Sequence, residues 1–128
     1  METGRTGGGG DPAVRALVVA DMLFASRVRG AADAAGFTVK VARPAALPGL
    51  VRETGTRLVL VDLELAGGKG PDAIRAIRSE RDLDGVRVVA FSSHMNRAAL
   101  EAGREAGADR VLARSAFVSQ LSGLLSEA

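Results

Sequence analysis

The chain has 128 residues, of which 17 are Lys or Arg, 15 are Asp or Glu, and 47% are hydrophobic, so we expect one globular domain rather than a disordered chain. The absence of cysteine excludes disulfides and thiolate chemistry, and a single histidine, His94, excludes a multi-histidine metal cluster. The pI of about 9.9 reflects arginine while the net charge is only +2, so the composition does not indicate nucleic-acid binding.

The N-terminal segment predicts a tail rather than a part of the fold. Residues 1–12 contain four consecutive glycines and no apolar periodicity, so we expect them to form a flexible Gly-rich tail. A phosphate-binding loop would need a preceding strand and a Lys-Ser/Thr ending, and this segment lacks both. The chain has no secretory signal and no apolar run approaching the roughly 20 residues of a membrane span, so we expect a cytoplasmic protein that binds no membrane.

Beyond the tail, short apolar segments alternate with amphipathic ones. The apolar segments are typical of strands buried on both faces of a parallel sheet: 14–20, 37–42, 57–61, 86–91 and 109–113. The amphipathic segments predict helices over 23–35, 44–54, 71–80 and 96–106, and a last helix capped by Ser115. The second helix contains Pro48 and Gly49, so we expect it to start late. This alternation predicts an α/β fold, a parallel sheet with helices on both faces and a site at the carboxyl ends of the strands.

Four polar side chains follow the expected strands directly: Asp21, Asp62, Ser92 and Arg114. Parallel strands end at the same edge of a sheet, so we expect these side chains to converge. Two carboxylates repel each other by roughly 4 kcal/mol at 4 Å for an effective dielectric near 20, and magnesium, which prefers oxygen ligands, is the natural ion between them. A serine hydroxyl and an arginine can hold an added phosphoryl group. The pattern predicts phosphoryl transfer onto a carboxylate.

Residues 15–125 resemble the receiver domains of two-component response regulators, a family with free-standing members of about this size. Four segments carry the resemblance: Leu-Val-Val-Ala-Asp21, Leu-Val-Leu-Val-Asp62, Val-Val-Ala-Phe-Ser92-Ser93, and Ala-Gly-Ala-Asp109 followed by Arg-Val-Leu-Ala-Arg114. The resemblance implies that residues 13–128 form a receiver-like domain. Its fold would be flavodoxin-like, (βα)5, with a five-stranded parallel sheet in the order 2-1-3-4-5.

The resemblance also implies roles for individual residues. Asp62 would accept the phosphoryl group, and magnesium would bind to Asp62, Asp21 and the main-chain carbonyl of Glu64. Ser92 would be the switch hydroxyl, and Arg114 would stand in for the lysine of the family. Such a domain is no enzyme beyond its own phosphorylation and dephosphorylation. Its partners would be a histidine kinase or phosphotransfer protein and a downstream protein bound through the fourth helix, fifth strand and fifth helix, with no nucleic acid, and the chain would be a monomer or weak homodimer.

Four departures from the family leave two functions open. Ala20 occupies the first acidic position, which weakens the magnesium site, and Arg114 brings a planar fork instead of an ammonium. Ser115 replaces a proline, so we expect a trans peptide bond and a differently aimed Arg114. Val111 replaces an aromatic switch residue. The first function is a stand-alone receiver phosphorylated on Asp62; the alternative is a pseudo-receiver, an interaction module independent of phosphorylation.

Simpler roles compete with these assignments. Asp21 is also placed to cap the first helix, and Arg114 would by itself be expected on the surface. His94 is expected as a partial cap or at the rim of the site. The arginines around the third helix, Arg78 among them, are expected on a solvated face. A cobalamin or dinucleotide domain of similar architecture would need an Asp-x-His-x-x-Gly or Gly-x-Gly-x-x-Gly stretch after the first strand, and neither occurs.

Overall fold

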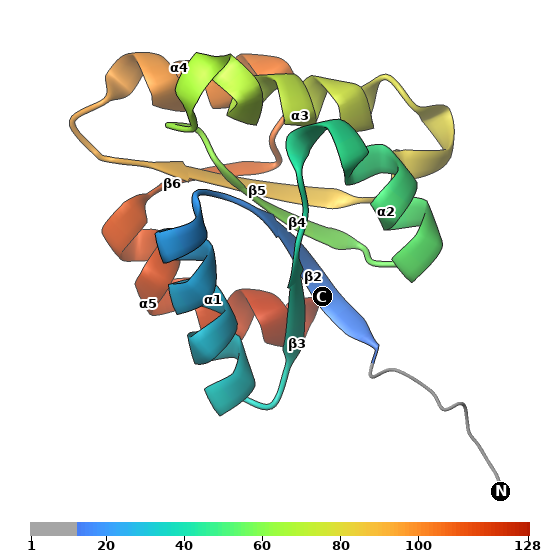
Figure 1. The fold of residues 1–128 in the computed structure, drawn as a ribbon. Coiled ribbons are helices and arrows are strands. Elements are labelled where there is room, and N and C mark those ends of the chain that lie inside the picture. The colour runs from blue at the N-terminus through green and yellow to red at the C-terminus, as the bar shows by residue number, and fades with distance from the viewer. Residues whose placement is uncertain (1–12) are drawn as a thin grey trace, which may run out of the picture.

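The computed structural model describes residues 13–128, and the expected tail, 1–12, lies outside the described residues. A five-stranded parallel sheet runs through the domain in the order β3-β2-β4-β5-β6, which is the expected order 2-1-3-4-5 (Figure 1). The strands are β2 (Val14–Val19), β3 (Thr38–Val41), β4 (Leu58–Asp62), β5 (Arg87–Ser92) and β6 (Arg110–Ala113). Each lies within one residue of its expected bounds, because a short apolar segment between polar residues marks a buried strand clearly.

Five α-helices cover both faces of this sheet. They are α1 (Met22–Ala34), α2 (Leu47–Thr54), α3 (Lys69–Arg78), α4 (Arg97–Ala106) and α5 (Arg114–Glu127). Three short 3₁₀ turns accompany them: η1 (Pro44–Ala46), η2 (Ala66–Gly68) and η3 (Arg81–Leu83). Helices α1 and α5 lie on one face, and α2, α3 and α4 lie on the other (Figure 1). None of the helices within residues 13–128 is long and apolar enough to cross a membrane.

Three helix starts show how local chemistry sets the boundaries. The late start of the second helix is confirmed: η1 precedes α2, and Pro48 lies in the first turn of α2, where its missing N–H costs nothing. The third helix begins at Lys69, earlier than expected, because Gly68 enters it with a left-handed φ of 69°. The expectation that Ser115 caps the last helix is wrong. That helix begins at Arg114 with Ala113 at the cap position, so Ser115 already lies inside it.

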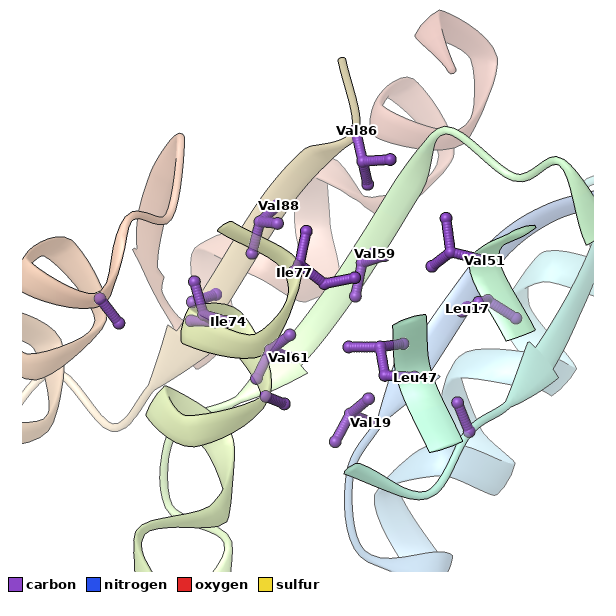
Figure 2. Close-up of a cluster of buried hydrophobic side chains, with 14 of the residues drawn as sticks. Leu17, Val19, Leu47, Val51, Val59, Val61, Ile74, Ile77, Val86 and Val88 are labelled. Carbon is purple, nitrogen blue, oxygen red and sulfur yellow. The ribbon is translucent and has the colours of Figure 1, made fainter. Parts of the chain in front are cut away.

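The core lies on both faces of the sheet. On one face Leu17, Val19, Val59 and Val61 pack against α2 and α3, as Figure 2 shows, and the alternate residues of the same strands pack against α1 and α5. Strand β4 lies in the middle of the sheet, and all of its residues are buried. The end of β4 is therefore held between two paired strands, β2 and β5.

Arg78 is a structural residue rather than a solvated one, which corrects the expectation for α3. Its guanidinium donates hydrogen bonds to the carbonyls of Gly107 at 2.8 Å and Val86 at 2.9 Å and to Oδ2 of Asp109 at 2.6 Å. The same Asp109 oxygen accepts the backbone N–H of Val88 at 2.7 Å. This network joins α3 to the segments that begin β5 and β6. The sequence around Arg78 does not indicate that the carbonyls of Gly107 and Val86 are its partners.

Candidate functional site

The four side chains expected to converge do lie at one edge of the sheet, at the carboxyl ends of the strands. Strand β4 ends at Asp62 and β5 at Ser92, and the register pairs Asp62 with Phe91. Strand β6 ends at Ala113, which pairs with Ser92, so that Arg114 follows directly. Asp21 follows β2 and begins the turn into α1. The arrangement follows from parallel topology alone, because every crossover returns the chain to the same edge.

Asp62 is a buried carboxylate, with 2% of its surface exposed. Its Oδ1 accepts the backbone N–H of Glu64 at 2.9 Å, and Nη2 of Arg114 lies 3.4 Å from Oδ1 and 3.5 Å from Oδ2. Burial raises the pKa of this carboxyl above its ordinary value, because the charged form loses water. The Glu64 N–H and the Arg114 charge oppose this rise in pKa, and the negative charge of Asp21 adds to it.

Asp62→Asn is expected to stabilise the protein increasingly as the pH rises. Because the folded chain holds the Asp62 proton more tightly than the unfolded chain, ionisation lowers the free energy of unfolding between the ordinary pKa of 3.8 and the raised one. The variant should match the wild type below that interval and be the more stable of the two proteins at neutral pH. Urea unfolding at acidic and neutral pH, in the presence of a chelator, measures the difference. An equal gain at both pH values would contradict this assignment.

Arg114 is aimed into the site, where the resemblance placed it, rather than out onto the surface, where it would be expected without the resemblance. The peptide bond to Ser115 is trans, as expected. From the first turn of α5 the guanidinium reaches both Asp62 and Glu64, whose Oε1 lies 3.4 Å from Nη2. Its Cζ lies 5.0 Å from the ring centroid of Phe24 and 6.0 Å from that of Phe91, and Nε is buried without a hydrogen-bond partner. The arginine therefore rests on aromatic rings and faces two carboxylates.

The side chain of Glu64 is a member of the site that the sequence did not indicate, since only its main-chain carbonyl was expected there. Its Oε1 accepts the backbone N–H of Ser93 at 3.1 Å, and its Oε2 accepts Nδ2 of Asn96 at 3.0 Å. These two hydrogen bonds and the charge of Arg114 lower the pKa of the Glu64 carboxyl. Glu64 thus ties the loop after β4 to the loop after β5. Its partners are about 30 residues away in the sequence, so no local pattern marks it.

Ser92 and His94 occupy different positions in this edge. The hydroxyl of Ser92 is fully buried and has no hydrogen-bond partner within the protein, which is an unfavourable state for a polar group. His94 is exposed in the loop between β5 and α4, at the rim. It does not cap α4, because Asn96 does so: Oδ1 of Asn96 accepts the backbone N–H of Ala99 at 3.0 Å. The Ser92 hydroxyl and Nε of Arg114 are the two buried side-chain atoms within residues 13–128 that lack a hydrogen-bond partner.

Asp21 caps the first helix, which was the simpler of its two expected roles. Its Oδ1 accepts the backbone N–H of Phe24 at 2.9 Å, and its extended backbone is typical of an N-cap residue. Its neighbour Ala20 contributes no oxygen from its side chain. Asp21 is exposed at the rim, close enough to Asp62 for its charge to raise the pKa of that carboxyl.

Solved structures share this architecture. The signal receiver domain of a DNA-binding response regulator from Colwellia psychrerythraea is 17% identical, with a TM-score of 0.71 over 88% of this chain and 94% of that one. The receiver domain of NtrX from Brucella abortus is 20% identical, with a TM-score of 0.69 over 88% of this chain and 99% of that one. The Mn²⁺-bound form of response regulator Rcp1 is 21% identical, with a TM-score of 0.64 over 91% of each chain. The chain has the receiver fold. No family model and no curated protein sequence matches it.

Within this receiver fold, the residues at the edge do not fit a magnesium ion as they lie. The expected ligands were Asp62, Asp21 and the carbonyl of Glu64, but both oxygens of Asp62 face Arg114, and Oδ1 of Asp21 caps α1. Among residues 13–128, no three side chains of His, Cys, Asp or Glu come together as a metal site. In this chain a guanidinium lies against the carboxylate of Asp62. Magnesium binding stays a prediction that this geometry does not support.

Proposed function

We propose that the chain is a signal receiver in two-component signalling, which accepts a phosphoryl group on Asp62 and passes on its state by protein contact. The observation that supports this most is the buried carboxylate of Asp62 at the carboxyl edge of a receiver fold, with Arg114 against it and the unpartnered hydroxyl of Ser92 on the neighbouring strand. A carboxylate, a cation and a free hydroxyl are the groups that an acyl phosphate needs around it.

The chemistry assigns one role to each of these groups. An oxygen of ionised Asp62 attacks the phosphorus of a phosphohistidine or acyl phosphate, the bond from phosphorus to the donor breaks, and the donor leaves with that electron pair. The guanidinium of Arg114 neutralises charge on the transferred phosphoryl oxygens, and Ser92 donates its hydroxyl hydrogen to one of them. Because Arg114 lies against both Asp62 oxygens, it must swing outward to admit the phosphoryl group. Its 39% exposed side chain has solvent to move into.

Exposed apolar side chains near this edge support a protein as the phosphoryl donor. Met22 and Leu23 at the start of α1 are 87% and 83% exposed, and Met95 in the loop between β5 and α4 is 77% exposed. Large apolar side chains left in solvent around a reactive carboxylate are suited to docking a partner. We propose that the phosphoryl donor is a histidine kinase or phosphotransfer protein and that the transfer takes place in the cytoplasm. We propose that a downstream protein binds to the surface formed by α4, β6 and α5, beneath which Val111 packs against the core.

The test is phosphorylation followed by intact-mass spectrometry. Incubation with acetyl phosphate, with and without magnesium, should add one phosphoryl group to the wild type. The adduct should be absent from Asp62→Asn and retained in Asp72→Asn, which removes an exposed aspartate that pairs with Arg75 in α3. A wild-type protein that gains no phosphoryl group from acetyl phosphate or from a phosphorylated phosphotransfer protein would contradict the proposal.

A second function, that of a pseudo-receiver, is favoured by one specific observation. Asp62 is only 2% exposed, and the guanidinium of Arg114 spans both of its oxygens, so no donor reaches the carboxylate unless Arg114 moves. In such a protein the ion pair of Asp62 and Arg114 has a structural role, and the binding of a partner protein does not depend on phosphorylation. Failure of both the wild type and Arg114→Ala to form an adduct would favour this alternative, because removing the arginine uncovers the carboxylate.

A further inference from the structure

We propose that the guanidinium of Arg114 is the resident cation of this site and that it keeps divalent metal ions away from Asp62. The inference goes beyond phosphoryl acceptance and does not depend on it, because it concerns what neutralises the carboxylates before any donor arrives.

The first step of the argument rests on the contacts of one nitrogen atom of Arg114. Nη2 of Arg114 lies 3.4 Å and 3.5 Å from the two oxygens of Asp62 and 3.4 Å from Oε1 of Glu64. One cationic group therefore faces three oxygens on two carboxylates. A magnesium ion bound to either Asp62 oxygen would stand about 2.0–2.1 Å from it, with a second positive charge a few ångströms away in a partly buried site. The guanidinium and the ion compete for the same oxygens and repel each other.

The second step is that packing orients Arg114 toward the carboxylates as long as no phosphoryl group displaces it. Its guanidinium lies over the ring of Phe24, its Nε is buried, and its backbone is fixed in the first turn of α5. A guanidinium is planar and weakly hydrated, so it stacks on aromatic rings in a way that an ammonium does not. A lysine at this position would lack the stacking plane. The arginine is therefore a positioned cation.

Most of the other side-chain oxygens at this edge already accept hydrogen bonds. Oδ1 of Asp21 accepts the backbone N–H of Phe24, and both oxygens of Glu64 accept hydrogen bonds, from Ser93 and Asn96. Ala20 supplies no carboxylate. A divalent ion at Asp62 would have to displace Arg114, and the side-chain ligands left to it are Oδ2 of Asp21, whose other oxygen caps α1, and the hydrogen-bonded carboxylate of Glu64. Removing the charge of Arg114 eliminates the largest of these obstacles.

Binding of Mn²⁺, followed by the electron paramagnetic resonance signal of the free ion, tests the proposal without any phosphoryl donor. The wild type should show no binding that depends on Asp62. Arg114→Gln and Arg114→Met both remove the charge, and the methionine keeps an apolar side chain over Phe24; each should bind Mn²⁺ at least about tenfold more tightly than the wild type. Asp62→Asn in the Arg114→Gln background should abolish the gain.

Arg104→Gln is the matched control, because it removes one charge from an exposed arginine of α4 that pairs with Glu101 at 3.3 Å. It should leave Mn²⁺ binding unchanged, which separates the local effect of Arg114 from a change in net charge. Tight wild-type binding that is lost in Asp62→Asn would overturn the proposal, and so would a folded Arg114→Gln or Arg114→Met protein with no gain. Circular dichroism establishes that each variant is folded. Phosphorylation of Asp62 is measured separately, so the two proposals fail independently.

Discussion

Replacing Gly70 with alanine is expected to lower the free energy of unfolding by about 3 kcal/mol, at the upper end of what overpacking costs. Gly70 lies in the first turn of α3, directly against the end of β4. A Cβ at this position would lie 2.4 Å from the carbonyl oxygen of Asp62, 3.0 Å from Cα of Leu63 and 3.2 Å from the carbonyl carbon of Asp62. These are backbone atoms that no rotamer change can move, so α3 or the end of β4 must shift. The shift would carry the Asp62 carboxylate with it.

Gly30→Ala is the matched control for this substitution. Gly30 lies inside α1, and a Cβ there would have no heavy atom within 4 Å. The alanine should raise the free energy of unfolding by about 0.5–1 kcal/mol, because glycine is a poor helix former. The chain has no Trp or Tyr, so urea unfolding is followed by circular dichroism rather than by tryptophan fluorescence. Similar effects of the two substitutions would show that the contact at Gly70 is not the cause.

The fold was predictable because its signals are local. Strands such as β4 are continuous apolar segments, and a polar residue, Asp62, ends β4, so the positions of these strands follow from the sequence directly. The alternation of strands and helices predicts a parallel sheet with helices on both faces. The strand order does not follow from alternation alone; it came from the resemblance to receiver domains, and the structure confirms it.

The site residues were predictable only where their position at the end of a strand determines where they lie in the fold. Asp62, Ser92 and Arg114 lie together because each ends or follows a strand of the same sheet, and Asp21 caps α1 through a contact three residues away. The side-chain contacts of Glu64 join residues about 30 positions apart, and only the packing of two loops brings them together. The same holds for Arg78 and its bonds to the starts of β5 and β6. Such contacts depend on side-chain directions that the strand pattern does not contain.

Phe117→Ala is expected to lower the free energy of unfolding by about 3–5 kcal/mol, the typical cost of deleting a fully buried aromatic ring. Phe117 of α5 has no exposed surface, and its ring stacks on that of Phe91 with centroids 4.2 Å apart and an angle of 19° between the ring planes. The ring of Phe24 lies 5.0 Å from Phe91 and 6.1 Å from Phe117. The three rings join α1, β5 and α5. The loss of one ring therefore leaves a cavity, because none of these three elements can move in to fill it without disturbing the packing of the other two.

The same ring cluster connects the core to the site. Arg114 rests on Phe24 and Phe91, and Phe117 supports both rings from the same helix that carries Arg114. Phe117→Leu keeps most of the volume and should cost about 1.5 kcal/mol or less, while Val118→Ala, at a 48% exposed neighbour, should stay within about 0.5 kcal/mol. If Phe117→Ala were no more destabilising than Val118→Ala, the ring cluster would not be the main contribution of Phe117 to stability. Urea unfolding of the three variants measures these differences. The comparison is informative because Phe117 and Val118 are neighbours in α5, one buried in the core and the other exposed to solvent.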